Sequence, residues 1–119
     1  GFIDPHTHVG DDLASPDAAK RLIPMFLLQG VTTAFIGNDG NGEPEVAATL
    51  ARASTAPVGI NYATWIGFGA ARARVMGMAD RAPTAAEMTV MRGLVAKGMC
   101  EGALGLSTGL FYAPQSFAA

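Results

Sequence analysis

Two histidines near the start of the chain have the spacing of a metal-binding pair. They stand in the segment Gly-Phe-Ile-Asp-Pro-His-Thr-His, whose apolar beginning predicts a β-strand over residues 2–8. Residues two apart on a strand project from the same face, so Asp4, His6 and His8 are predicted to point the same way. Two imidazoles placed like this can bind one divalent cation, and Asp4 can accept a ring N–H and fix its tautomer. The alternative is a polar turn after a strand, because His-x-His also arises by chance.

Asp39 is the candidate third ligand. It follows residues 31–36, an apolar and β-branched segment that predicts a second strand. Because the carboxyl ends of parallel strands lie at one edge of a sheet, Asp39 is predicted beside the histidines. A carboxylate there can bind a metal ion or bridge two. The alternative is an ordinary turn, since Asn-Asp-Gly is common turn chemistry.

The glycine-rich loop over residues 37–42 precedes a predicted helix, and backbone N–H groups at such a place can hold a phosphate. Three observations count against a phosphate. The glycines lack the spacing of phosphate-binding loops, no lysine follows them, and Asp39, Glu43 and Glu45 would repel an anion.

Arg72 and Tyr112 are candidate substrate contacts. Arg72 stands in a stretch over residues 65–82 that is predicted to be irregular, and an arginine at the mouth of a site can bind a carboxylate. Tyr112 follows the last predicted strand and can reach a ligand at the same edge. The commoner roles are a solvated surface charge for Arg72 and packing against neighbouring loops for Tyr112.

Strands and helices are predicted to alternate along the chain. Four strands are expected over residues 2–8, 31–36, 58–62 and 103–107. The helix after Ser15 should be kinked or split by Pro24, and the last helix should begin at a Thr84–Glu87 capping box. This alternation predicts an α/β fold with a parallel sheet. Four strands and three helices would make about half of a (β/α)8 TIM barrel, although a doubly wound open sheet fits equally well.

Composition predicts one unit over residues 1–119 with no internal boundary. Half of the residues are hydrophobic and 15% are charged, which suits a segment mostly buried in a larger fold. The net charge of −2 favours neither nucleic acid nor an anionic membrane surface as a partner. Cys100 is the single cysteine and has no intrachain disulfide partner. Because the chain starts inside a predicted strand, we expect a fragment; the compartment is expected to be the cytoplasm, with the periplasm as the alternative.

Three segments together resemble the N-acyl-D-amino-acid deacylase (D-aminoacylase) branch of the amidohydrolase superfamily. Residues 1–8 resemble the opening signature of the superfamily, and residues 29–40 resemble the second barrel strand of this branch. Residues 102–114, Gly-Ala-Leu-Gly-Leu-Ser-Thr-Gly-Leu-Phe-Tyr-Ala-Pro, are close to a signature of the branch itself. The resemblance covers nearly the whole chain and implies the N-terminal portion of a (β/α)8 barrel.

The resemblance implies an enzyme that uses one or two Zn²⁺ ions to hydrolyse the amide bond of small N-acyl-D-amino acids. His6 and His8 match the first two metal ligands of the family, and Tyr112 falls where a tyrosine lies near the substrate carboxylate. The family's other histidines and its catalytic aspartate belong to later strands. No catalytic residue is therefore expected within residues 1–119, and this segment without the rest of the barrel is expected to be inactive.

Two positions depart from the family pattern. Asp39 stands where the branch usually has a cysteine ligand, and a carboxylate is a harder ligand that favours harder metals. Phe68 stands where related sequences often carry a histidine, and it cannot bind a metal. Metal identity and substrate pocket can therefore differ from those of the family.

Two alternatives stay open. One is another amidohydrolase, such as a hydantoinase-like, dihydroorotase-like or isoaspartyl-dipeptidase-like enzyme, since most specificity loops lie on later strands. The other is a non-catalytic α/β ligand-binding domain that uses the loop over residues 37–42. Such a domain would hold no metal at His6 and His8.

Overall fold

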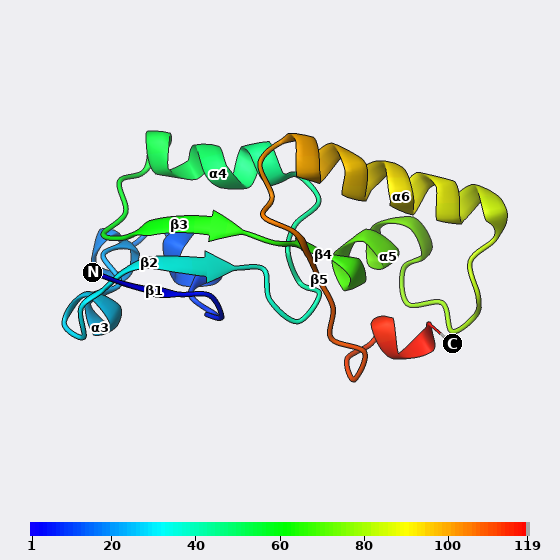
Figure 1. Cartoon of the computed structure of the whole chain (residues 1–119), viewed down its shortest axis with the longest axis horizontal. Coiled ribbons are helices and arrows are strands. Elements are labelled where there is room, and N and C mark those ends of the chain that lie inside the picture. Colours follow the sequence, from blue (N-terminus) through cyan, green and yellow to red (C-terminus); the bar gives the residue numbers. More distant parts are fainter. Residues whose placement is uncertain (119) are drawn as a thin grey trace.

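The computed structural model describes residues 1–118, so Ala119, the last residue of the predicted unit, lies outside the described part. Short strands alternate with helices along it (Figure 1). In chain order the elements are β1 (Phe2–Asp4), α1 (Gly10–Leu13), α2 (Ala18–Arg21), α3 (Pro24–Leu27), β2 (Val31–Ile36), α4 (Val46–Thr55), β3 (Asn61–Thr64), β4 (Ile66–Gly67), α5 (Phe68–Met76), α6 (Ala85–Cys100), β5 (Leu106–Ser107) and the 3₁₀ helix η1 (Gln115–Phe117).

All strand pairs are parallel. The order β1-β2-β3 forms one sheet, in which Thr33 pairs with Ile3 on one side and Asn61 on the other. β4 pairs with β5, and β4 follows β3 after the single residue Trp65. The N–H of Leu104 donates to the carbonyl of Thr64 at 3.0 Å, so β5 runs beside the joined β3 and β4. The α/β class with parallel strands is thus confirmed, and the arrows of β2 and β3 point in the same direction in Figure 1.

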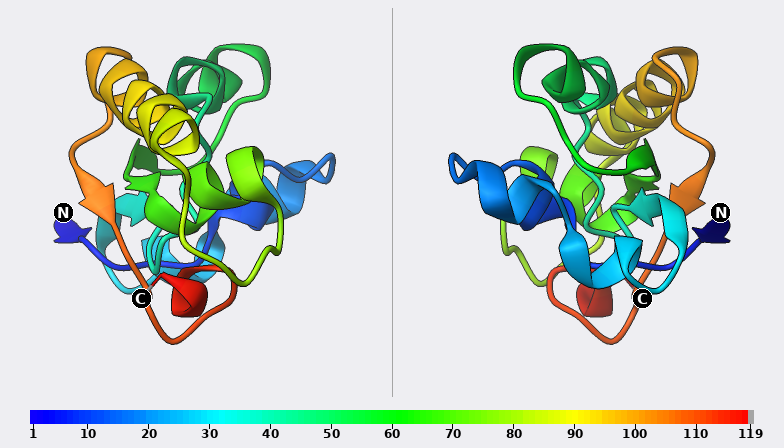
Figure 2. Two further views of the ribbon diagram at one scale, coloured as in Figure 1. Left: turned by 90° about the vertical axis from the view of Figure 1, so that its right-hand side faces the viewer. Right: turned by 90° about the vertical axis from the view of Figure 1, so that its left-hand side faces the viewer.

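The helices bury one face of the strands. Ala34 and Ile36 of β2 are buried in a cluster with Val9, Leu13, Ile23 and Ile60. A second cluster is formed by Val46, Ile66 and Ala103, with Leu50 and Val95 packed against it. Figure 2 looks along the strands and shows α4 and α6 side by side above them. The rings of Phe35 and Trp65 stack edge to face, with centroids 5.5 Å apart.

Several predicted elements are confirmed. The strand over residues 31–36 has its predicted bounds. The helix after Ser15 is split as Pro24 requires, because Ile23 adopts a left-handed φ of 48° directly before the proline. The Thr84–Glu87 capping box begins α6: the Thr84 hydroxyl accepts from the Glu87 N–H at 3.2 Å, and the Glu87 carboxylate accepts from the Thr84 N–H at 2.7 Å.

Other predicted bounds are wrong. The first strand ends at Asp4 instead of reaching residue 8, and the third begins at Asn61 instead of residue 58. Residues 65–82 contain β4 and α5, although they were predicted to be irregular. α5 is rich in Ala, Gly and Arg, and it buries small residues such as Gly69 and Ala71. It therefore lacks the periodic apolar stripe that reveals a helix in a sequence. No helix within residues 1–118 has the length and apolarity that a membrane crossing requires.

Candidate metal centre

His6, His8 and Asp39 converge at the carboxyl ends of β1 and β2. The Oδ2 atom of Asp39 lies 3.7 Å from Nε2 of His6 and 3.4 Å from Nε2 of His8. One ligand atom from each of the three residues lies within 4.8 Å of the other two. Ligands bound to one tetrahedral zinc at about 2.0–2.2 Å are separated by roughly 3.3 Å. The spacing and the chemistry of these donors therefore fit a divalent cation.

The two imidazoles are presented by a turn and not by a strand, which corrects the sequence-based explanation of their shared direction. Thr7 lies between them and is buried. Its N–H and its hydroxyl both donate to the carbonyl of Phe35, at 3.1 and 2.7 Å. Because Thr7 is tied to the end of β2, the histidines on either side of it are left exposed and can face Asp39.

Asp4 supports the same turn through the backbone. Its Oδ1 accepts from the N–H of His6 at 3.1 Å. The prediction placed this carboxylate against an imidazole ring, whereas the structure pairs it with the main chain of the first histidine. Asp4, the last residue of β1, therefore fixes the backbone of His6 just after the strand ends.

Asn38 is a site residue that the sequence-based reasoning missed. It is buried, and its Nδ2 donates to the carbonyls of Thr7 at 2.8 Å and Phe35 at 3.1 Å. This side chain joins the histidine turn to the loop that carries Asp39. The sequence could have indicated this role, because Asn38 stands just after β2 and next to a candidate ligand. A buried amide at the end of a strand can donate to carbonyls that have no partner in the sheet.

Asp39 is both a turn residue and a member of the cluster. Its φ is 56°, a left-handed conformation that Asp adopts more readily than most residues. The N–H of Asn41 donates to the carbonyl of Asn38 at 3.0 Å and closes the turn. The interpretations of Asp39 as a turn residue and as a candidate ligand are therefore compatible, because the turn directs its carboxylate toward the histidines.

Arg72 and Tyr112 lie in different surroundings. The Arg72 side chain is 1% exposed, and its Nη2 donates to the carbonyls of Ala79 at 3.0 Å and Arg81 at 2.8 Å. Within residues 1–118 it makes no hydrogen bond to His6, His8 or Asp39. Tyr112 is half exposed, and its ring lies against Gly109, which also lies against the carbonyl of Asp39. The loop over residues 108–112 that carries Tyr112, called the Tyr112 loop below, thus adjoins Asp39, whereas Arg72 does not.

Phe68 opens α5 and lines an apolar hollow of about 350 Å³ together with Met88, Met91, Val95 and Leu106. Met91 is buried there, as expected for a methionine that fills the core. In the described residues Phe68 therefore belongs to an apolar hollow between α5 and α6.

A hollow of about 330 Å³ opens beside the cluster. It is lined by Thr7, His8, Gly10, Asp11, Gly37, Asn38 and Asn41. Asp11 is the charged side chain of this lining, and neither Lys nor Arg belongs to it. The hollow thus places a negatively charged side chain beside the candidate ligand His8, which favours a cation.

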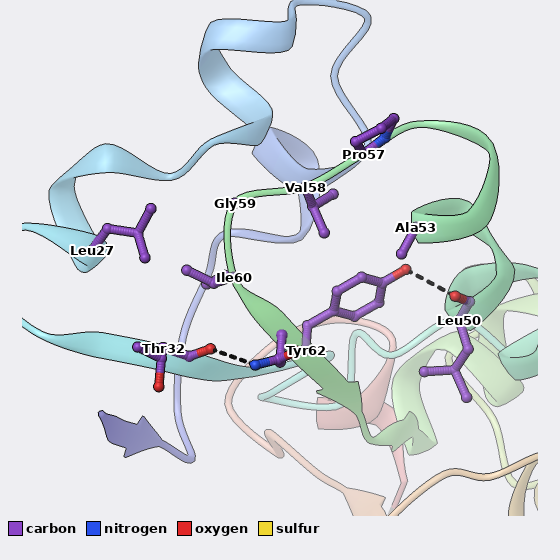
Figure 3. A pocket seen from close by; sticks show the side chains of 10 residues that line it. Leu27, Thr32, Leu50, Ala53, Pro57, Val58, Gly59, Ile60 and Tyr62 are labelled. Atoms are coloured by element: carbon purple, nitrogen blue, oxygen red, sulfur yellow. Dashed lines mark hydrogen bonds between the residues drawn. The ribbon is translucent and has the colours of Figure 1, made fainter.

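A second hollow, of about 610 Å³, lies toward the amino ends of β2 and β3, between these strands, α3 and α4 (Figure 3). Tyr62 points across it, and its hydroxyl donates to the carbonyls of Thr49 at 2.7 Å and Leu50 at 3.2 Å. The residues that line this hollow include neither His nor Cys, and neither Asp nor Glu. The chemistry belongs at the opposite ends of the strands, where parallel α/β folds place it.

A parallel α/β frame with two histidines and a carboxylate at the carboxyl ends of its first strands defines a class: the metal-binding α/β folds to which the amidohydrolases belong. Solved structures narrow this class. One is the structure of a D-aminoacylase with a binuclear metal center. It superposes on this chain with a TM-score of 0.85 at 31% identity, and the match covers 100% of this chain and 29% of the D-aminoacylase. An N-acyl-D-glutamate deacylase from Bordetella bronchiseptica, complexed with zinc and a phosphonate inhibitor, gives a TM-score of 0.81 at 29% identity, also over 29% of its length.

Curated sequences agree with the structures. The chain is 33% identical to a D-aminoacylase and 35% identical to an N-acyl-D-aspartate deacylase, both from Alcaligenes xylosoxydans xylosoxydans. These matches take in 98% and 99% of this chain, which spans 28% of each relative's length. No protein-family model matches the chain. The resemblance to the D-aminoacylase branch of the amidohydrolase superfamily is confirmed over the whole chain.

Proposed function

We propose that this chain carries part of the metal centre of an enzyme that hydrolyses the amide bond of N-acyl-D-amino acids. The observation that carries the proposal is the convergence of His6, His8 and Asp39 at the carboxyl ends of two neighbouring parallel strands. It is supported by the similarity to D-aminoacylase and to deacylases of N-acyl-D-aspartate and N-acyl-D-glutamate.

The three residues would hold one or two Zn²⁺ ions. A bound Zn²⁺ ion lowers the pKa of its water and polarises an amide carbonyl. His6 and His8 offer their Nε2 atoms, and Asp39 offers Oδ2 with a compensating negative charge. Both imidazoles are more than half exposed, at 60% and 66%, whereas Asp39 is 26% exposed. The exposed side of the histidines leaves room for a substrate and for ligands from other parts of the enzyme.

With β3 and β4 counted as one strand interrupted at Trp65, the parallel strands β1, β2, β3–β4 and β5 would form about half of a (β/α)8 barrel. Two features support this arrangement: the helices cover one face of the strands, and β1 and β5 each have a single neighbouring strand within residues 1–118. The remaining strands would supply the other metal ligands and the catalytic acid or base. Residues 1–119 alone would then be inactive.

Tyr112 would contact the substrate. Its half-exposed ring belongs to a loop that lies against the carbonyl of Asp39, so a ligand at the metal centre would be within the reach of this loop. We do not extend this proposal to Arg72, because its guanidinium is buried and donates to backbone carbonyls.

The test is to measure zinc content and hydrolysis in the protein that carries this chain. His6→Ala combined with His8→Ala should abolish stoichiometric zinc, and Asp39→Ala should lower zinc content strongly. Asn41→Ala is the matched control, because Asn41 is an exposed residue of the same loop. Unchanged zinc in the double variant would refute the metal centre and favour a non-catalytic binding domain.

The substrate class needs a separate measurement. Paired N-acyl-D- and N-acyl-L-amino acids should be hydrolysed at very different rates, with the D form preferred. Hydantoins, dihydroorotate and isoaspartyl dipeptides form the comparison panel. Preference for one of these would keep the metal centre but assign the enzyme to another amidohydrolase branch.

A further inference from the structure

We propose that Gln115 is a positioning residue that fixes the Asp39 ligand and the Tyr112 loop in one frame. This inference rests on the proposed metal centre. Gln115 is the first residue of η1, and its side chain is 1% exposed. A buried carboxamide must satisfy both its donor and its acceptor, and the partners that Gln115 uses place it at the centre.

The two ends of this carboxamide bond to two different loops. Nε2 donates to the carbonyl of Asp39 at 2.8 Å, across a separation of 76 residues. Oε1 accepts from the N–H of Gly109 at 2.7 Å. Gly109 begins the segment that leads to Tyr112, so one side chain connects the backbone of a metal ligand with the backbone of the proposed substrate loop.

The surroundings hold Gln115 in one position. A Cβ atom added at Gly40 or at Gly69 would overlap the carboxamide, so the chain brings two glycines against it from two sides. These glycines allow the backbone to approach closely, and they leave the amide no free space in which to rotate. The hydrogen bonds to Asp39 and Gly109 are therefore part of a closed packing arrangement.

Asp39 depends on such support because its left-handed backbone conformation is outside the strand ladder. Ser107 ties the residues around it: its hydroxyl donates to the carbonyl of Gly37 at 2.5 Å and accepts from the N–H of Gly40 at 3.1 Å. Gln115 holds the carbonyl of Asp39 itself. The carbonyl carbon and the carboxylate-bearing Cβ are bonded to the same Cα atom, so a shift of the Asp39 backbone would move the carboxylate relative to the histidines, and the amide would act on the metal by holding that backbone.

The arrangement predicts that metal binding and the order of the Tyr112 loop are coupled. A cation that fixes Asp39 also fixes the carbonyl to which Gln115 donates, and this steadies the acceptor that holds Gly109. Coupling of this kind is reciprocal, so a ligand bound by the Tyr112 loop should tighten metal binding by the same factor.

Two substitutions separate the two bonds. Gln115→Met fills most of the same volume and removes both. Gln115→Glu keeps an acceptor for the Gly109 N–H and removes the donor to Asp39. Gln29→Ala is the matched control, because the Gln29 amide also donates to a backbone carbonyl, that of Met25 at 2.6 Å, but on the exposed surface beside α3.

The readouts are zinc affinity by competition with a chelator and the absorption spectrum of the Co²⁺-substituted protein. Outer hydrogen-bond partners of metal ligands typically contribute 10- to 100-fold to affinity, so we expect both Gln115 variants to bind zinc about tenfold more weakly. Their cobalt spectra should be shifted, whereas Gln29→Ala should match the wild type. Hydrogen exchange over residues 108–112 should rise in Gln115→Met and stay near wild type in Gln115→Glu.

The outcomes distinguish this inference from the proposed function. Absence of zinc binding in the wild-type protein would overturn the metal centre itself. Wild-type binding with unchanged affinity and cobalt spectrum in both variants would overturn only the role of Gln115. If a variant does not fold, hydrogen exchange of the wild type still decides: zinc should slow exchange over residues 108–112, and equal exchange with and without zinc would overturn the coupling.

Discussion

Asn38→Ala should weaken both the fold and the metal centre, and its cost can be worked out bond by bond. The wild-type amide donates to two carbonyls, those of Thr7 and Phe35. The Phe35 carbonyl would keep two donors, the N–H and the hydroxyl of Thr7. The Thr7 carbonyl would lose the donor that Asn38 provides. The substitution therefore leaves one buried acceptor unsatisfied.

One unsatisfied buried acceptor costs about 1–3 kcal/mol, so we expect Asn38→Ala to lower the free energy of unfolding by about 2 kcal/mol. Thr7→Val should cost less, about 1 kcal/mol, because the acceptor it abandons keeps two donors and the volume is nearly unchanged. The assay is urea unfolding of the metal-free protein, with Asn41→Ala as the exposed control from the same loop.

The metal should report the same perturbation. Asn38 holds the residue between the two histidines, so its removal allows the turn to move relative to Asp39. Zinc affinity should fall by roughly 10- to 100-fold. A free energy of unfolding of Asn38→Ala within about 0.5 kcal/mol of the wild type, the ordinary range for a surface substitution, would refute this role of Asn38. A lower free energy of unfolding with unchanged zinc affinity would show that the amide supports the fold alone.

Three further predictions concern the rest of the fold. Thr84→Ala should lower the free energy of unfolding by about 1 kcal/mol, measured in urea, because it removes the cap of α6. Arg81 and the Thr84 cap lower the pKa of Glu87 from 4.5 to about 2, so its stabilisation should be complete above pH 4.5 and lost as the pH falls toward 2; Glu87→Gln should flatten this part of the unfolding profile. Arg72→Met should destabilise by about 2–4 kcal/mol and speed hydrogen exchange over residues 77–83, with zinc content unchanged.

The sequence could predict what depends on neighbouring residues. The bounds of β2 follow from its β-branched run, the break at Ile23 follows from Pro24, and the start of α6 follows from its capping box. Each of these signals lies within a few residues of the structure it specifies. The three candidate ligands could also be predicted, because each follows an apolar strand-forming segment.

The framework around the ligands could not be predicted in this way. Asn38 acts on Thr7 across 31 residues, and Gln115 acts on Asp39 across 76. Neither contact leaves a periodic or spaced pattern. Arg72 was predicted as a substrate contact, with a solvated surface charge as the alternative. In the structure it belongs to α5, a helix that the periodicity did not reveal, and its side chain is buried.

The resemblance to the D-aminoacylase branch implies a cysteine ligand at position 39, and a carboxylate as the proposed ligand there would place a demand on this framework. A carboxylate oxygen is one covalent bond further from the backbone than a thiolate sulfur, while metal–oxygen bonds of about 2.0–2.2 Å are only slightly shorter than metal–sulfur bonds of about 2.3 Å. Asp39 therefore reaches further and can also rotate at its terminal bond. A loop that binds a metal through this longer side chain needs a firmly held backbone. Ser107 accepts from the N–H of Gly40 and Gln115 donates to the carbonyl of Asp39, so both side chains hold the peptide that follows Asp39. Asn38, the residue before Asp39, is anchored through its amide to the carbonyls of Thr7 and Phe35, and together these bonds supply the rigidity that the longer side chain would require.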